Sequence, residues 1–175
     1  MALGEAFAAA GMAVLRCDLP YRQRRRTGPP APRDAPADRA GLRHAVQALR
    51  ETCGGRLFLG GQSYGGRMAS MLLADEPGLA SGLLLLSYPV HPPGRPDDVR
   101  SQHLPGLRAP VLFVHGDRDP FGSPDEVAAV RALVPAATGL VQVPGGHDLG
   151  WGGGRGDPAL PGRIVEAFHA LMAGR

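Results

Sequence analysis

Gly60-Gly61-Gln62-Ser63-Tyr64-Gly65-Gly66 is the part of the sequence from which the fold can be inferred, because it joins two apolar segments. The run 56–60 before it predicts a strand, and 67–74 after it predicts a helix. Ser63 has a glycine two positions before it and another two positions after it, at 61 and 65, where we expect a side chain to clash with its neighbours. Such a strained turn presents a serine hydroxyl at the end of a strand, so Ser63 is a candidate nucleophile.

Apolar strand-like runs and helical segments alternate along the rest of the chain. The predicted strands are 12–17, 56–60, 83–88, 111–115 and 140–143, and the predicted helices are 2–10, 38–54, 67–74, 123–133 and 160–172. This alternation predicts an α/β fold, a parallel sheet flanked by helices, in a single domain over residues 1–175. The stretches 20–36 and 91–110 are rich in proline and arginine, and we expect both to be long surface loops without a helix.

A serine hydroxyl needs a base to accept its proton, and a histidine held by a carboxylate is the usual base. Ligands of parallel sheets bind beyond the carboxyl ends of the strands, so residues that follow a strand are the candidates. Among the six histidines, His147 lies just beyond the last predicted strand, and it comes last in the chain order serine, acid, histidine. We therefore predict His147 as the base, with His115 as the alternative.

The acid is expected after the penultimate strand, where two aspartates, Asp117 and Asp119, lie two positions apart. Asp117 is nearer the strand end and can cap the turn, so we predict Asp119 as the acid and keep Asp117 as the alternate. The backbone N–H of Tyr64 begins the next helix and is predicted to stabilise a developing oxyanion. Tyr88 and Trp151 are candidate substrate-binding residues, because each lies near a predicted site loop.

The composition argues against several other classes of function. Much of the excess behind the net charge of +3 lies in one run, 22–26, and binding of phosphate backbones takes a wider basic face, so no nucleic-acid partner is expected. Cys17 and Cys53 belong to no paired cysteine motif, so we expect neither a zinc site nor a disulfide. This use of cysteine predicts a cytoplasmic protein. No segment approaches the roughly 18 apolar residues of a membrane span.

Three motifs together resemble the α/β-hydrolase superfamily: GGQSYGGRMAS at 60–70, HGDRDPFGSPDEV at 115–127 and PGGH at 144–147. The nearest branches are small proteins similar to dienelactone hydrolase and to NSL-complex subunits. The resemblance implies a triad of Ser63, Asp119 and His147 and no metal or organic cofactor. It also implies cleavage of an ester, thioester or related acyl bond in a small-molecule substrate. Dienelactone hydrolases proper have a cysteine nucleophile, so their particular substrate is not carried over.

The resemblance also implies strands and a His-Gly-type loop before the helix that residues 1–11 resemble. That loop supplies a second oxyanion donor in the superfamily. We expect this sequence to start after those strands and that loop. The Tyr64 N–H is then the one oxyanion donor expected here, and the missing strands would expose a sheet edge through which an oligomer can form. Two explanations are open. Either Met1 is an internal methionine of a longer protein, or another segment of the chain supplies the second oxyanion donor. The alternative function is a catalytically silent scaffold for protein binding.

Overall fold

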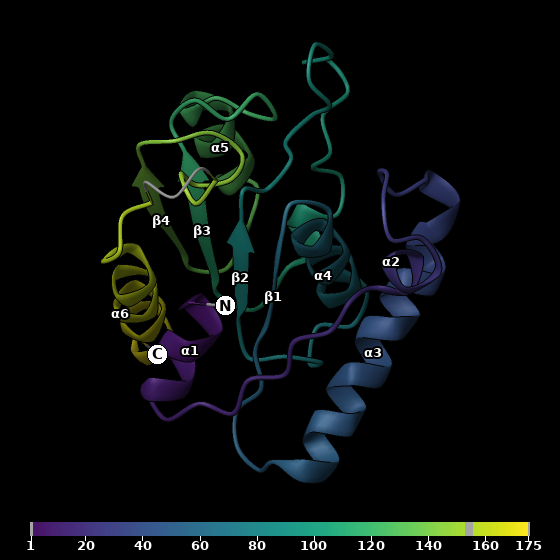
Figure 1. The fold of residues 1–175 in the computed structure, drawn as a ribbon, viewed down its shortest axis with the longest axis vertical. Helices are drawn as coiled ribbons and strands as arrows, with labels where there is room; N and C mark the ends of the chain where they lie inside the picture. The colour runs from purple at the N-terminus through teal and green to yellow at the C-terminus, as the bar shows by residue number, and fades with distance from the viewer. Residues whose placement is uncertain (1, 153–155, 175) are drawn as a thin grey trace.

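A four-stranded parallel sheet forms the centre of the computed structural model, which describes residues 2–152 and 156–174. The strands follow one another across the sheet in the order β1-β2-β3-β4. The strands are β1 (Leu59–Gln62), β2 (Leu83–Leu86), β3 (Val111–Gly116) and β4 (Thr138–Val143). The predicted α/β fold with a parallel sheet flanked by helices is confirmed (Figure 1).

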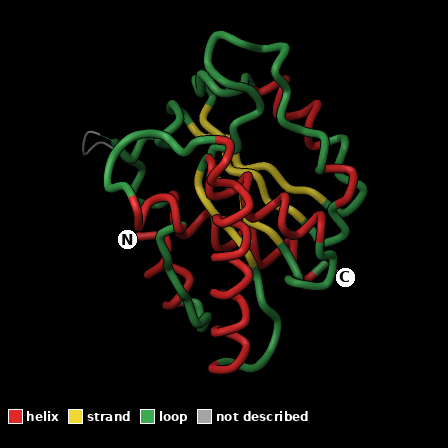
Figure 2. Tube along the Cα trace, turned by 90° about the vertical axis from the view of Figure 1, so that its right-hand side faces the viewer, coloured by secondary structure: helices red, strands yellow, loops and turns green. Residues whose placement is uncertain are grey.

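Helices cover both faces of the sheet (Figures 1 and 2), because strand side chains alternate between the faces. The helices are α1 (Ala2–Ala9), α2 (Pro20–Arg24), α3 (Ala35–Thr52), α4 (Tyr64–Asp75), α5 (Pro124–Arg131) and α6 (Leu160–Ala173), with short 3-10 turns at Pro32–Asp34 and Leu104–Gly106. In β2, Leu83 and Leu85 pack with α3, α4 and α5, whereas Leu84 and Leu86 pack with α1 and α6. None of the helices in the described part of the chain is long and apolar enough to cross a membrane.

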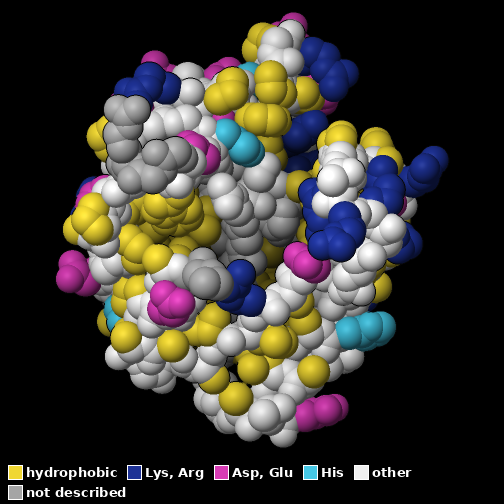
Figure 3. Space-filling model, in the orientation of Figure 1, with side chains coloured by type: hydrophobic (Ala, Val, Ile, Leu, Met, Phe, Trp, Pro, Cys, Tyr) yellow, Lys and Arg dark blue, Asp and Glu magenta, His cyan; other side chains and the backbone are white. Residues whose placement is uncertain are grey.

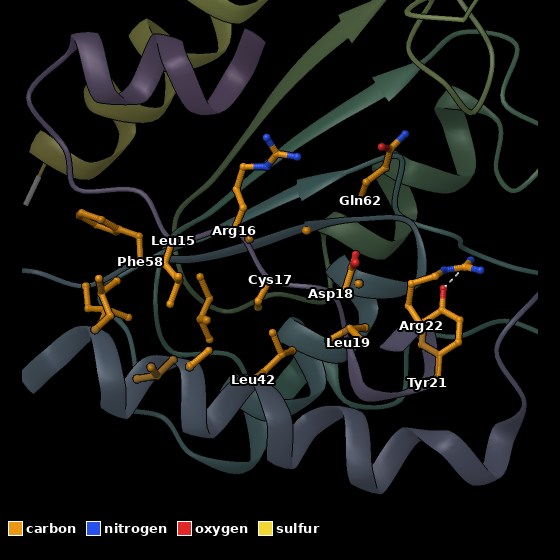
Figure 4. Close-up of a pocket in the computed structure, with 18 residues that line it drawn as sticks. Leu15, Arg16, Cys17, Asp18, Leu19, Tyr21, Arg22, Leu42, Phe58 and Gln62 are labelled. Atoms are coloured by element: carbon orange, nitrogen blue, oxygen red, sulfur yellow. Dashed lines mark hydrogen bonds between the residues drawn. The ribbon is translucent and has the colours of Figure 1, made fainter. Parts of the chain in front are cut away.

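The prediction of a strand over 12–17 is wrong: this segment is a loop. Its side chains still alternate, because Leu15 and Cys17 point toward α3 and Arg16 points the opposite way (Figure 4). Its backbone pairs with no strand of the described residues, and a cavity of about 520 Å³ is lined both by this segment and by β1. An apolar run is typical of a strand, but a strand also needs a neighbour at hydrogen-bonding distance. β1 is therefore an edge strand of the described sheet.

The expectation of an uninterrupted loop over 20–36 is also wrong, because α2 forms within it. Proline is tolerated in the first turn of a helix, and Pro20 occupies that place in α2. Asp34 then accepts hydrogen bonds from Arg24 at 3.1 Å and Arg25 at 2.9 Å, which neutralises part of the basic run. Basic side chains nevertheless gather on the side of the molecule where α2 lies (Figures 1 and 3).

The turn between β1 and α4 depends on glycines, although not on the pair that the sequence pattern indicates. A Cβ at Gly61 would lie 2.5 Å from the carbonyl carbon of Gly65, and a Cβ at Gly66 would lie 2.6 Å from the carbonyl oxygen of Gly61. A Cβ at Gly65 would meet nothing within 4 Å. The predicted clash at position 65 is therefore wrong, because α4 begins so abruptly that Gly66 is the residue turned back onto β1.

This packing predicts opposite effects of the same substitution at neighbouring positions. Gly66→Ala is expected to lower the free energy of unfolding by about 1–3 kcal/mol, because the new methyl group meets a backbone carbonyl that cannot move aside. Gly65→Ala is the matched control, and it is expected to be neutral or stabilising by up to about 1 kcal/mol through helix propensity. Urea unfolding followed by circular dichroism measures both. Equal destabilisation by the two variants would contradict the packing described here.

Candidate active site

Ser63, Asp119 and His147 come together at the carboxyl end of the sheet, each from the segment that follows a strand. Ser63 follows β1, Asp119 follows β3 and His147 follows β4. Ser63 Oγ lies 2.7 Å from Nε2 of His147, although the two residues are 84 positions apart in the sequence. Nδ1 of His147 lies 2.8 Å and 3.0 Å from the two carboxylate oxygens of Asp119. The structure thus brings together the three residues that the sequence singled out.

The backbone holds Ser63 in a strained conformation, with φ of 52° and ψ of −121°. A non-glycine residue with positive φ persists only where its surroundings hold it, and the Ser63 N–H donates to the carbonyl of Leu86 at 2.8 Å. α4 begins immediately afterwards at Tyr64. The N–H groups of the first helical turn have no partner within the helix, so the Tyr64 N–H is free to bind negative charge beside Ser63.

The carboxylate of Asp119 fixes the orientation and the tautomer of His147. Its side chain is fully buried, whereas that of His147 is 26% exposed. The proton on Nδ1 is donated to Asp119, which leaves the lone pair of Nε2 directed at the Ser63 hydroxyl. A hydroxyl, an imidazole and a carboxylate in this order can pass a proton from the serine to the histidine.

The two alternates from the sequence occupy different places. Asp117 accepts a hydrogen bond from the N–H of Gly145 at 2.9 Å, so it ties the loop after β3 to the loop that carries His147. His115 is only 2% exposed, and its Nε2 donates to the carbonyl of Gly122 at 2.8 Å. Neither side chain bonds to Ser63. Within the described ranges, no group of three or more histidine, cysteine or acidic side chains is placed to hold a metal ion.

Asp38 is a site neighbour that the sequence reasoning missed. It is fully buried, and its two carboxylate oxygens accept the Tyr64 hydroxyl and the N–H of Tyr21, both at 2.8 Å. Burial, and then the hydrogen bond to Asp38, raise the pKa of the Tyr64 phenol above its ordinary value, so the hydroxyl remains a donor. A signal was present, because Asp38 lies on the same helical stripe as Leu42 and Val46.

Two further contacts on His147 left no recognisable signal in the sequence. The ring of Phe121 stacks on the imidazole with centroids 4.1 Å apart and planes inclined by 30°. The side-chain amide of Gln62 donates to the backbone carbonyl of His147 at 3.3 Å. Both contacts depend on how separate loops meet above the sheet, which local patterns do not encode.

The structure separates the two substrate-binding candidates. Tyr88 is 1% exposed and its hydroxyl donates to the carbonyl of Arg100, so it belongs to the core and does not line an open pocket. Its position after β2, an inner strand covered by helices, explains this burial. Trp151 is half-buried and lines a cavity of about 410 Å³ that also borders the open edge of β1.

Comparison with known proteins shows the family to which the chain belongs. Residues 1–156 match the family described as an alpha/beta hydrolase domain. A dienelactone hydrolase from Anabaena variabilis has a similar structure, with a TM-score of 0.72 and 22% identity over 97% of this chain and 77% of that one. Est1E from Butyrivibrio proteoclasticus, solved with ferulic acid bound, has a TM-score of 0.72 and 18% identity over 98% of this chain and 82% of that one.

A structure reported for the metagenome-derived lipolytic enzymes LipS and LipT is similar as well, with a TM-score of 0.70 and 17% identity. That match covers 99% of this chain and 86% of the other. At such identities the likeness to these structures establishes the fold alone. Together with the match over residues 1–156, it leads to one conclusion: the chain belongs to the α/β-hydrolase domain family.

Proposed function

We propose that this protein is a single-domain serine hydrolase that cleaves an ester, thioester or related acyl bond through an acyl-enzyme on Ser63. The observation that carries the proposal is the continuous contact from Ser63 Oγ through His147 to the buried carboxylate of Asp119, with distances of 2.7 Å and 2.8 Å. Each of the three side chains is held by a different loop, and their order matches the order of proton transfer.

In the proposed acylation step, the Ser63 oxygen attacks the acyl carbon while Nε2 of His147 accepts the hydroxyl proton. The imidazolium that forms is stabilised by Asp119, whose contact with Nδ1 is already made in the free protein. The carbonyl oxygen of the substrate gains negative charge. The Tyr64 N–H, which directly follows Ser63 at the start of α4, is proposed to donate a hydrogen bond to this oxygen. His147 then passes its proton to the leaving group as the tetrahedral intermediate collapses.

In the proposed deacylation step, water takes the place of the leaving group. His147 removes a proton from the water, the resulting hydroxide attacks the acyl carbon, and the proton returns to Ser63 as the carboxylic acid departs. Water and substrate supply every atom of the products, and the proposed steps involve no metal and no organic cofactor. The partial exposure of His147, at 26% of its side chain, supports access of water and of a small-molecule substrate from one side.

The role of Ser63 predicts selective labelling by a fluorophosphonate, which traps activated serines. The wild-type protein is expected to be labelled once, at Ser63, and Ser63→Ala is expected to abolish the label. Ser70→Ala is the matched control, because Ser70 Oγ also contacts a histidine, His103, at 2.7 Å but is fully buried. Mass spectrometry of the labelled peptide gives the site.

The same labelling experiment separates the enzyme from the non-catalytic alternative. If the folded wild-type protein is not labelled and releases no p-nitrophenol from p-nitrophenyl acetate, the enzyme proposal fails. The catalytically silent scaffold then becomes the better reading of the family membership.

The assignment of the acid predicts unequal effects of two nearby substitutions. Asp119→Asn is expected to reduce kcat for p-nitrophenyl acetate by about 10³–10⁴-fold, because the amide no longer stabilises the imidazolium. Asp117→Asn is expected to change kcat by less than about 10-fold, since the asparagine oxygen can still accept the Gly145 N–H. Steady-state kinetics on both variants measure the difference. A larger loss from Asp117→Asn would move the acid assignment to Asp117.

A further inference from the structure

Phe121 has a fixed position against His147. Its N–H donates to Asp119 at 2.9 Å, and its carbonyl accepts the N–H of His91 at 3.1 Å. The backbone of Phe121 is therefore held on both sides, and its ring lies on the imidazole at a centroid distance of 4.1 Å. The same short loop thus supplies both the carboxylate that binds Nδ1 of His147 and the ring that covers the face of the imidazole.

The charged and titratable groups around His147 act in other directions. Ser63 and Asp119 contact the two ring nitrogens, at the edge of the ring. Asp148 follows His147 directly, and hydrogen bonds from the N–H groups of Gly150 and Gly152 lower its pKa, so it stays ionised. The titratable groups farther away are Asp117 and Arg118, on the loop after β3, and His115, near the end of β3. Among the described contacts, Phe121 is the side chain that stacks on the imidazole face.

An aromatic face carries partial negative charge and attracts a cation whose centre lies within about 6 Å of its centroid. The Phe121 ring is inside that range. A neutral imidazole gains less from the same contact, so the contact favours the protonated ring. Exclusion of water by the apolar ring acts in the opposite direction, because desolvation disfavours a charged imidazole. These two effects can be separated by replacing the aromatic ring with an aliphatic side chain of similar volume.

We propose that Phe121 is a positioning residue whose ring face stabilises the imidazolium form of His147. The inference rests on the proposed function, in which this imidazolium forms in both acylation and deacylation. Stacking also restrains rotation of the imidazole about its side-chain bonds, so that Nε2 remains directed at Ser63. Phe121 thereby forms a second link between the loop after β3 and the base, beside the hydrogen bond that His147 donates to Asp119.

The test is an NMR titration of the His147 ring proton in a Ser63→Ala background, where no turnover is needed. The resonance is assigned by its loss in His147→Gln. Phe121→Leu keeps an apolar cover but removes the aromatic face, and it is expected to lower the titration midpoint by about 0.4–1 pH unit. Phe121→Trp is expected to keep or raise the midpoint. Phe58→Leu removes an aromatic ring that packs against Phe168 and is expected to leave the midpoint unchanged.

An unchanged or raised midpoint in folded Phe121→Leu would overturn the inference, since it would show that the aromatic face does not stabilise the imidazolium. If that variant does not fold, pentafluorophenylalanine at position 121 keeps the shape and reverses the charge of the face. A lowered midpoint then supports the inference, and an unchanged or raised one overturns it.

Kinetics distinguish this inference from the proposed function. With p-nitrophenyl acetate, Phe121→Leu in the Ser63 protein is expected to move the acidic limb of the kcat/KM profile to lower pH and to reduce kcat more than it changes KM. A protein that hydrolyses no ester, yet shows the NMR shift, would disprove the proposed function and leave the contact between Phe121 and His147 intact.

Discussion

The close approach of Gly66 to the carbonyl of Gly61 is the contact on which the geometry of the site depends. A Cβ at Gly66 would lie 2.6 Å from that oxygen, so α4 can begin directly behind β1 only because the side chain is absent. Ser63, which lies between these two glycines, has a positive φ and donates its N–H to the carbonyl of Leu86 at 2.8 Å. The close approach, the strained serine and the abrupt start of α4 at Tyr64 are therefore parts of one tight turn.

Parallel pairing of the strands supplies the rest of the site. Because β1 through β4 run in one direction, their carboxyl ends meet at one edge of the sheet, where Ser63, Asp119 and His147 lie. The loops above that edge are then tied to one another. Asp117 binds the N–H of Gly145, and Phe121 binds both Asp119 and the ring of His147. The imidazole is thus held by the chain on two nitrogens and one face.

On the other flank of the sheet, β1 has an edge, beside the segment 12–17, that pairs with no other strand of the described residues. Leu15 and Cys17 face α3 as a strand would place them (Figure 4), yet this segment does not pair with β1, and both line the cavity of about 520 Å³. An apolar run and strand pairing are therefore separate properties, and the first does not guarantee the second. The buried Asp38 links this flank to the site, since it binds both Tyr21 and Tyr64.

Local patterns in the sequence determined the α/β class, four of the five predicted strands and the candidate residues Ser63, Asp119 and His147, whose catalytic roles remain predictions. Those features depend on periodicity and on chain order, which a sequence carries directly. Tertiary structure alone decided that Gly66 and not Gly65 is crowded, that Tyr88 is buried, that 12–17 has no strand partner and that Phe121 covers His147. Each of these depends on the distance between segments far apart in the chain, and packing sets that distance only when the whole sheet has formed.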